Sequence, residues 1–425
     1  MGSNANTPQA GAAASVMSLK EVLGIRPLRR LWMAQVISVF GDFLAMFAVF
    51  SVVSFRMHAS ATEISLLLVA FLLPMALFGP VAGVLVDRWN VRRTMIASDL
   101  VRAVLAALLV LATDVREIWL ILFALSTISS LFIPAQSVTV RTIVPPAGLI
   151  SANALMQNAV QLMLVIAPAI SGALVALLSA KVCFWLDSLS FVASALLIAS
   201  LTVKREAAAG KLTLAGVGRD MKAGLVFIFS HQMVTFAIVA MTVGTFAIRC
   251  FFAMIAVYVR DVLSGGSLLF GAINSLLGIG IIFGAQSIHK AARNRSKGNL
   301  VLTGLLGLGL SITLMAALGN TAATLISTLG IGVAIGFLVV PTQALLQEQT
   351  PREMLGRVSS SLMAVTSVAQ VVAMCLAGPA AQQLGIRNLY FLIAGLLLML
   401  AIAGYLRLNR PAASRARALQ DQPNA

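Results

Sequence analysis

Long apolar runs separated by short polar segments constrain the fold of this chain more than any other feature of its sequence. Twelve such runs occur in 425 residues, and each approaches the roughly 20 apolar residues that cross about 30 Å of hydrocarbon. Only 10% of the residues are charged and 60% are hydrophobic, whereas a soluble domain carries about 25% charged residues. The sequence therefore predicts an all-α integral membrane protein with 12 transmembrane helices, expected at about residues 31–55, 64–86, 94–112, 118–140, 151–178, 182–203, 234–259, 268–288, 300–318, 322–346, 358–381 and 389–406.

Basic residues are distributed unevenly between the segments that join these helices. Of the 30 Lys and Arg residues, 23 fall in segments that would share one side of the membrane, and 5 fall on the other side. Because cytoplasmic loops carry the excess of basic residues, both termini are expected in the cytoplasm. We attribute the net charge of +16 to this orientation. No nucleic-acid partner is expected, since no basic stripe carries interleaved aromatic residues.

A repeat with an offset of 207 residues divides the chain into two halves. The segment Leu131–Gln136 (Leu-Phe-Ile-Pro-Ala-Gln) recurs as Leu338–Gln343 (Leu-Val-Val-Pro-Thr-Gln). Parallel repeats of this kind occur in transporters whose two halves are related by an axis along the membrane normal. The predicted parts are an N-terminal tail and surface segment (1–30), a six-helix bundle (31–203), a cytoplasmic linker (204–222), a second six-helix bundle (223–408) and a C-terminal tail (409–425).

A short charged segment follows the second predicted helix and contains Gly83, Asp87, Arg88, Arg92 and Arg93. It resembles the cytoplasmic loop motif of the major facilitator superfamily, which is a Gly, three residues, Asp-Arg, a second Gly and basic residues. With the helix number and the repeat, the resemblance covers about residues 30–408. It implies two pseudo-symmetric six-helix bundles, the major facilitator fold, and transport by alternating access with this segment as a gating loop. Asn90 replaces the second Gly, and we expect it to keep a left-handed turn, which Asn tolerates better than most residues.

Two branches of the superfamily share further residues with this chain. Gly41-Asp42, Pro134-Ala-Gln136 and Gly356-Arg357-Val358 resemble exporters of the macrolide and enterobactin type. That resemblance implies a protein of the bacterial inner membrane that exports a hydrophobic or amphipathic small molecule in exchange for protons. Gly41-Asp42, Arg249 and residues 339–348 also resemble the bacterial lysophospholipid transporter, which implies flipping of a lysolipid coupled to sodium. A non-transporting membrane sensor or scaffold is a third hypothesis.

Two charged residues are predicted at matching depths within the membrane. Asp42 lies near the middle of the first helix, and the repeat offset places Arg249 at the equivalent position in the seventh. A charge inside the membrane costs roughly 2.5–3.5 kcal/mol on insertion scales, so it is expected to face a partner or a water-filled cavity. We hypothesise a state-dependent ion pair in which Asp42 accepts a proton or a cation. Arg249 would regulate Asp42 or hold an anionic group, and a permanent structural pair is the alternative.

Asp99 and Arg102 are three residues apart and therefore share one face of the third helix. A local structural pair, or membership in a charge cluster around Asp87, is predicted for them. Asp187 is expected near the outer end of the sixth helix, in a solvated or capping role. Arg141 and Glu348 end the fourth and tenth helices, where they are predicted to be gate partners of the Asp87 loop.

Several polar residues interrupt the apolar helices, namely Gln136, Gln343, Asn153 and Gln157. Such side chains either join helices through hydrogen bonds or bind a ligand in a central cavity. No metal-ligand spacing, phosphate-binding Gly-rich loop or nucleophile–base cluster occurs in the sequence, so no enzyme activity, cofactor or metal is expected. The expected partners are a small amphipathic substrate or a lysolipid, protons or sodium, and membrane lipids. The protein is expected to be a monomer.

Overall fold

The computed structural model describes residues 17–202, 228, 230–293, 295–351 and 354–408. The predicted linker (204–222) and C-terminal tail (409–425) lie outside these residues, as does most of the N-terminal tail. A few side chains within helices, including that of Asp87, also lie outside the described part. The domain boundaries at these segments therefore stay predictions.

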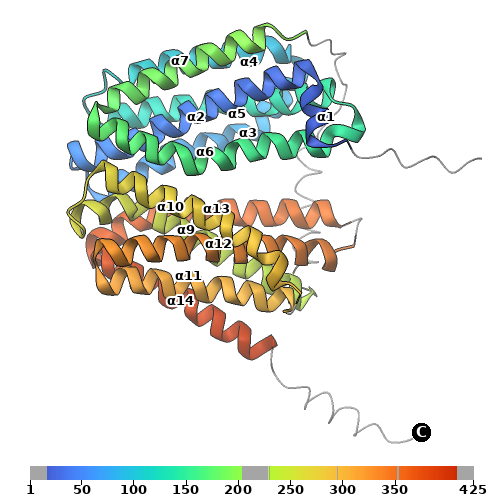
Figure 1. Cartoon of the computed structure of the whole chain (residues 1–425). Coiled ribbons are helices and arrows are strands. Elements are labelled where there is room, and N and C mark those ends of the chain that lie inside the picture. Colours follow the sequence, from blue (N-terminus) through green and yellow to red (C-terminus); the bar gives the residue numbers. More distant parts are fainter. Residues whose placement is uncertain (1–16, 203–227, 229, 294, 352–353, 409–425) are drawn as a thin grey trace, which may run out of the picture.

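The described residues form thirteen α-helices, of which the first, α1 (Leu19–Gly24), is short. One half of the molecule contains α2 (Arg26–Ser51), which continues as a π-helical turn η1 (Val52–Arg56), then α3 (Ala61–Arg88), α4 (Val91–Leu108), α5 (Val115–Ile143), α6 (Leu149–Leu177) and α7 (Ala180–Ala199). The other half contains α9 (Gln232–Asp261), α10 (Ser267–Ala291), α11 (Lys297–Leu318), α12 (Thr321–Gln349), α13 (Leu355–Leu384) and α14 (Ile386–Leu408). Figure 1 shows the two halves as separate layers of helices.

The described part of the chain contains twelve long helices, as predicted, and eleven of them are long and apolar enough to span a membrane. The remaining helix, α4, is more polar because its 18 residues include Arg92, Arg93, Asp99 and Arg102. It packs alongside α5 and α7 within the first half. The structure thus confirms the predicted all-α fold with two six-helix bundles.

Capping residues fix the helix ends at the turns between helices. Ser60 caps α3 and Asp114 caps α5, and in each case a Glu three residues later binds back to the capping residue. This reciprocal arrangement satisfies backbone N–H groups that have no partner within the helix. At the C-terminal end of α11, Gly319 ends the helix with a positive φ of 59°, a conformation that glycine adopts without a steric penalty.

Asn90 shapes the turn between α3 and α4, but the predicted left-handed conformation is wrong. Its backbone is extended, with φ of −72° and ψ of 107°. The Asn90 Oδ1 atom instead accepts a hydrogen bond from the backbone N–H of Arg93 at 3.1 Å. Asn therefore serves at this position because it is a good N-cap for α4, not because it tolerates positive φ.

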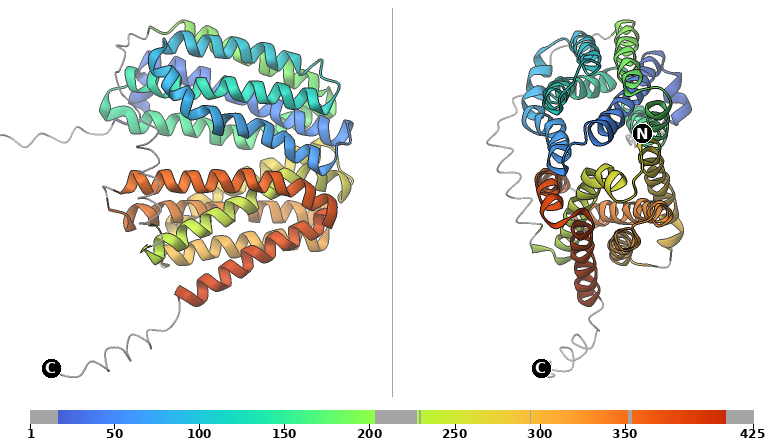
Figure 2. Two further views of the ribbon diagram at one scale, coloured as in Figure 1. Left: turned by 180° about the vertical axis from the view of Figure 1, so that it is seen from behind. Right: turned by 90° about the vertical axis from the view of Figure 1, so that its left-hand side faces the viewer.

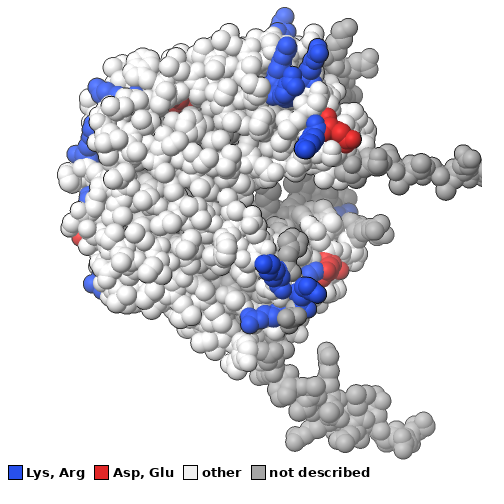
Figure 3. Space-filling view, in the orientation of Figure 1, with Lys and Arg blue, Asp and Glu red and all other residues white. Residues whose placement is uncertain are grey.

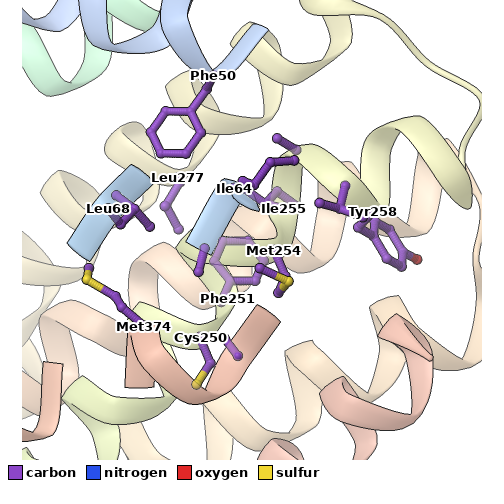
Figure 4. Close-up of a cluster of buried hydrophobic side chains, with 14 of the residues drawn as sticks. Phe50, Ile64, Leu68, Cys250, Phe251, Met254, Ile255, Tyr258, Leu277 and Met374 are labelled. Atoms are coloured by element: carbon purple, nitrogen blue, oxygen red, sulfur yellow. The ribbon is translucent and has the colours of Figure 1, made fainter. Parts of the chain in front are cut away.

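The two halves are joined tightly at one end of the molecule, here called the closed end, where α2 leads into α3 and α9 leads into α10 (Figures 1 and 2). Phe270 of α10 lies among three phenylalanines of the first half, at ring-centroid distances of 5.7, 6.3 and 6.2 Å from Phe47, Phe50 and Phe55. A wider buried cluster combines apolar side chains of both halves, including Ile64 of α3 and Ile255 of α9 (Figure 4).

Glycines allow the halves to approach closely near this end. A Cβ atom added to Gly271 of α10 would lie 2.5 Å from the carbonyl oxygen of Pro168 in α6. A Cβ atom added to Gly378 of α13 would lie 2.6 Å from the Cα atom of Thr62 in α3. Close packing of small residues is a main source of helix association within membranes, where burial of apolar surface contributes little.

Polar contacts also connect the halves at the closed end. The Arg260 Nη1 atom of α9 donates hydrogen bonds to the carbonyl oxygens of Ser54 (2.9 Å) and Ala59 (2.8 Å). The Thr62 hydroxyl of α3 donates to the Gln382 side-chain oxygen of α13 at 2.6 Å. At the opposite end, here called the open end, the surface is hollowed between the halves and basic side chains flank the cleft (Figure 3).

Replacing Arg260 by Gln is expected to loosen the closed end, because each hydrogen bond from a charged donor contributes about 1.5–3 kcal/mol. The readout is labelling of a cysteine at Met46, which lines the cavity described below. The three native cysteines are replaced, and an impermeant maleimide is added from the closed side. We expect several-fold faster labelling in the Arg260→Gln variant. Arg387→Gln is the matched control, since Arg387 bonds the carbonyl oxygens of Ala316 and Ala317 within its own half. Equal labelling rates in all three proteins would contradict the assigned role.

Candidate functional site

A cavity of about 330 Å³ lies within the first half. Its walls are mainly apolar and include Phe43, Met46, Phe71, Met75 and Phe132. Three charged residues also line it, Asp42 of α2, Arg102 of α4 and Asp187 of α7. A concave, largely apolar site with a few convergent polar groups is the usual form of a small-molecule binding site.

Arg102 is the centre of the charged group. Its Nη2 atom donates a hydrogen bond to Asp99 Oδ1, one turn earlier on α4, so the predicted contact between these two residues is present. Its Nη1 atom lies 4.0 Å from Asp42 Oδ2 of α2. The guanidinium also lies over the rings of Phe132 and Phe191, at 4.3 and 4.4 Å from their centroids. Arg102 therefore lies between two carboxylates and against two aromatic faces, which attract cations.

The three carboxyl groups around Arg102 differ in their access to the cavity. The Asp42 side chain is 46% exposed, whereas Asp99 and Asp187 are 0% and 1% exposed. Asp42 is thus the member that a substrate or solvent can reach. With every group ionised, three carboxylates and one guanidinium would carry a net charge of −2. Because burial of unbalanced charge is unfavourable, such a group of side chains is chemically suited to hold protons.

Asp187 is the residue that sequence reasoning placed incorrectly. It was expected to be solvated or to cap a helix, but it is buried two turns inside α7 and directly beside Gly41. A Cβ atom on Gly41 would lie 2.7 Å from Asp187 Oδ1, so only a glycine before Asp42 leaves room for this carboxyl group. The Asp187 Oδ1 atom has no hydrogen-bond partner among the described residues. A signal was available in the small polar residues Ser190 and Ser194, which continue the same helical face.

Arg249 lies in α9 and is half-buried. Among the described residues, no ion pair joins it to Asp42, whose nearest cationic group is Arg102. The predicted Asp42–Arg249 pair is therefore not formed in this conformation. Because the pair was proposed to depend on the transport state, its formation in another conformation stays a prediction.

Three of the four predicted polar residues, Gln136, Asn153 and Gln157, line a cavity in the described part of the chain, and Gln343 does not. The Gln136 side-chain nitrogen donates to Gln35 Oε1 of α2, which joins α5 to α2. Gln35, Gln136, Asn153 and Gln157 line an adjoining cavity of about 480 Å³ that shares residues with the first one. Gln343 is exposed on α12 and is not among the described lining of either cavity.

The predicted gating loop lies at the open end and is a tight turn. Only Trp89 and Asn90 separate α3 from α4. Arg92 donates a hydrogen bond to the carbonyl oxygen of Ala199, which fastens α4 to the end of α7, while Arg88 and Arg93 are exposed. The roles assigned to Gly83 and Asp87 as gating residues stay predictions.

The two predicted gate partners of this loop do not reach it through any described contact. Glu348 of α12 forms an ion pair with Lys297 of α11, within its own half of the molecule. Arg141 is exposed at the end of α5. In this conformation Glu348 is paired within its own half, and the assignment of Glu348 and Arg141 as partners of the loop stays a prediction.

The sequence matches the model of the Major Facilitator Superfamily over residues 31–362 and 295–424. A curated relative from Bacillus subtilis (strain 168), the uncharacterised MFS-type transporter YfiS, is 27% identical over 88% of this chain and 91% of its own. Macrolide efflux protein A from Streptococcus pyogenes is 21% identical over 87% of this chain and 92% of its own. The multidrug efflux pump Tap from Mycolicibacterium fortuitum is 25% identical over 81% of this chain and 87% of its own.

Solved structures share the fold at low sequence identity. The nucleoside transporter NupG (D323A mutant) superposes with a TM-score of 0.71 at 12% identity, over 89% of this chain and 98% of its own. A bacterial homologue of the human lysosomal transporter Spinster superposes with a TM-score of 0.69 at 12% identity, over 91% of this chain and 97% of its own. These likenesses describe the arrangement of the helices.

Proposed function

Because the chain belongs to the major facilitator superfamily and is a membrane transporter, we propose that it exports hydrophobic or amphipathic small molecules in exchange for protons. The observation that carries this proposal is the position of Asp42. Its side chain is 46% exposed in a mainly apolar cavity, and its Oδ2 atom lies 4.0 Å from the buried Arg102. A substrate in this cavity would therefore lie directly beside a group that can gain or lose a proton.

The charges around Asp42 support a coupling role. Asp99 already bonds Arg102, so the guanidinium can offset only part of the charge on Asp42 and Asp187. We infer that Asp42 and Asp187 hold at least one proton between them while the cavity lacks a cation. A bound substrate that is cationic, or that excludes water from Asp42, changes the free energy of this proton. Linkage of this kind is reciprocal, so proton release and substrate binding favour or oppose each other by the same amount.

The substrate class is inferred from the cavity walls and from the relatives. Apolar side chains form most of the cavity wall and include Met46 and Met75, and methionine adapts its shape to different ligands. Two of the relatives are named as a macrolide efflux protein and a multidrug efflux pump. Both observations favour an amphipathic molecule of low charge over a sugar or a small ion.

The predicted orientation indicates which side of the membrane the open end faces in this conformation. If the basic open end faces the cytoplasm, the present conformation is open inward and closed by Phe270 and Arg260 outward. A substrate would enter from the cytoplasm or the inner leaflet, and rocking of the halves would expose it to the outside. The closed end would then have to open once per cycle.

Efflux from energised cells tests the proposal. We expect a macrolide or ethidium to leave cells that express the protein several-fold faster than control cells, with the difference abolished by a protonophore. A fluorescent lysolipid flip assay in proteoliposomes distinguishes the alternative function. Flipping without efflux would overturn the proposal in favour of a lysolipid transporter, and no flux in either assay would favour a sensor or scaffold.

A further inference from the structure

A second groove, of about 530 Å³, lies outside the transport cavity, at the open end between α4 and α5. Its polar part is formed by Arg88, Trp89 and Arg93 at the turn between α3 and α4. Its apolar part extends along Val101 of α4 and Leu131 of α5. It shares no lining residue with the two cavities described above.

The apolar part of this groove opens toward lipid. Val101 is 44% exposed, and its neighbours on the same face of α4, Leu100 and Val104, are 48% and 61% exposed. In a membrane-spanning bundle, apolar side chains that face away from the helices and from the cavity contact acyl chains. Val101 lies ten residues into α4, which corresponds to about 15 Å of depth at 1.5 Å per residue. The groove therefore runs from the membrane surface well into one leaflet.

The polar part of the groove has the chemistry of an anion site. Arg88 and Arg93 are exposed, and neither guanidinium has an ion-pair partner in the described part of the chain. The described lining includes no acidic side chain. The N-terminus of the 18-residue helix α4 lies at the same place and contributes partial positive charge. Trp89, which is 48% exposed, has the amphipathic character of residues found at the head-group level.

We propose that this groove binds an anionic phospholipid of the adjacent leaflet. Arg88 and Arg93 hold the phosphate, because guanidinium groups match its oxygen atoms in geometry and charge. One acyl chain lies along Val101 and Leu131. The lipid contacts the turn between α3 and α4 and the side of α5, so it stabilises the packing of these three helices at the open end.

The test compares lipids and variants in nanodiscs. Thermal stability is measured in phosphatidylglycerol and in phosphatidylcholine, and bound lipid is counted by mass spectrometry of the released protein. We expect phosphatidylglycerol to be retained and to raise the Tm of the native protein. Since a basic residue near an anionic membrane contributes about 1 kcal/mol, the Arg88→Gln/Arg93→Gln variant should bind this lipid at least tenfold more weakly.

Two further variants keep the result interpretable. Arg293→Gln/Arg295→Gln removes the same charge from exposed positions of the other half and should bind like the native protein. Ala97→Trp fills the apolar part of the groove and should displace the lipid with both arginines intact. The proposal is overturned if the Arg88/Arg93 variant retains phosphatidylglycerol as the native protein does. It is also overturned if the two double variants lose it equally, or if inorganic phosphate alone reproduces the stabilisation.

Discussion

Replacing Asp42 by Asn is expected to abolish uphill transport while leaving downhill exchange of substrate intact. Asn has the shape of Asp but cannot release a proton, so the two halves can still rock while the proton gradient no longer drives the cycle. In proteoliposomes with an imposed pH gradient, accumulation of the transported macrolide or dye should fall by at least about tenfold, which corresponds to about 1.4 kcal/mol of lost coupling. Counterflow at equal pH should stay within a factor of a few of the native rate.

Asp114→Asn is the matched control for this experiment. Asp114 is exposed and caps α5, and Asn is an equally good N-cap, so the same chemical change there should leave both assays unaltered. Gradient-driven accumulation by the Asp42→Asn variant at the native level would remove Asp42 from the coupling mechanism.

Replacing Arg102 by Gln is expected to have the largest effect on stability. The change leaves Asp99, which is 0% exposed, without its cationic partner, and it removes the cation that lies over Phe132 and Phe191. Breaking a buried ion pair by removing one partner destabilises proteins by about 3–5 kcal/mol. Unfolding in detergent with increasing denaturant should show a loss of this size.

The double variant Asp99→Asn/Arg102→Gln separates the ion pair from simple loss of packing. It removes the unpaired charge and should recover much of the lost stability, as expected for two residues that interact directly. Arg116→Gln serves as the control, because Arg116 is exposed at the start of α5. A loss below about 1 kcal/mol in Arg102→Gln, or no recovery in the double variant, would contradict the role of Arg102 as the centre of the group.

The fold was predictable because the membrane limits the choices for the backbone. Apolar length placed the helices to within a few residues, as for α3, predicted at 64–86 and observed at Ala61–Arg88. The charged residues of α4 alone argue against a membrane-spanning helix. The alternation of basic and less basic loops along the chain supports it as one, because the alternation requires an even number of spans. The π-helical extension of α2 at Val52–Arg56 carries no comparable pattern in the sequence.

For the candidate site, the sequence predicts how deep in the membrane each residue lies, but not the direction in which its side chain points around the helix axis. The sequence indicates how deep Asp42 and Arg249 lie, because depth follows from position along a helix. It does not indicate which neighbouring helix each side chain faces. The packing of α2 against α7, with Gly41 beside Asp187, decides that Asp42 belongs with Arg102 and Asp187 in one half. The repeat favoured a pair across the halves, which this conformation does not contain.

The most direct test of the account is a measurement of proton release on substrate binding. The purified protein is placed in weakly buffered detergent solution with a pH indicator, and the compound that the efflux assay identifies as a substrate is added. A cationic substrate beside Asp42 favours the ionised form of the carboxyl group. For a cationic compound such as ethidium we therefore predict proton release in proportion to bound substrate for the native protein, and none for the Asp42→Asn/Asp187→Asn variant. Substrate binding to the native protein without proton release, or equal release from the variant, would contradict proton coupling through this group of residues.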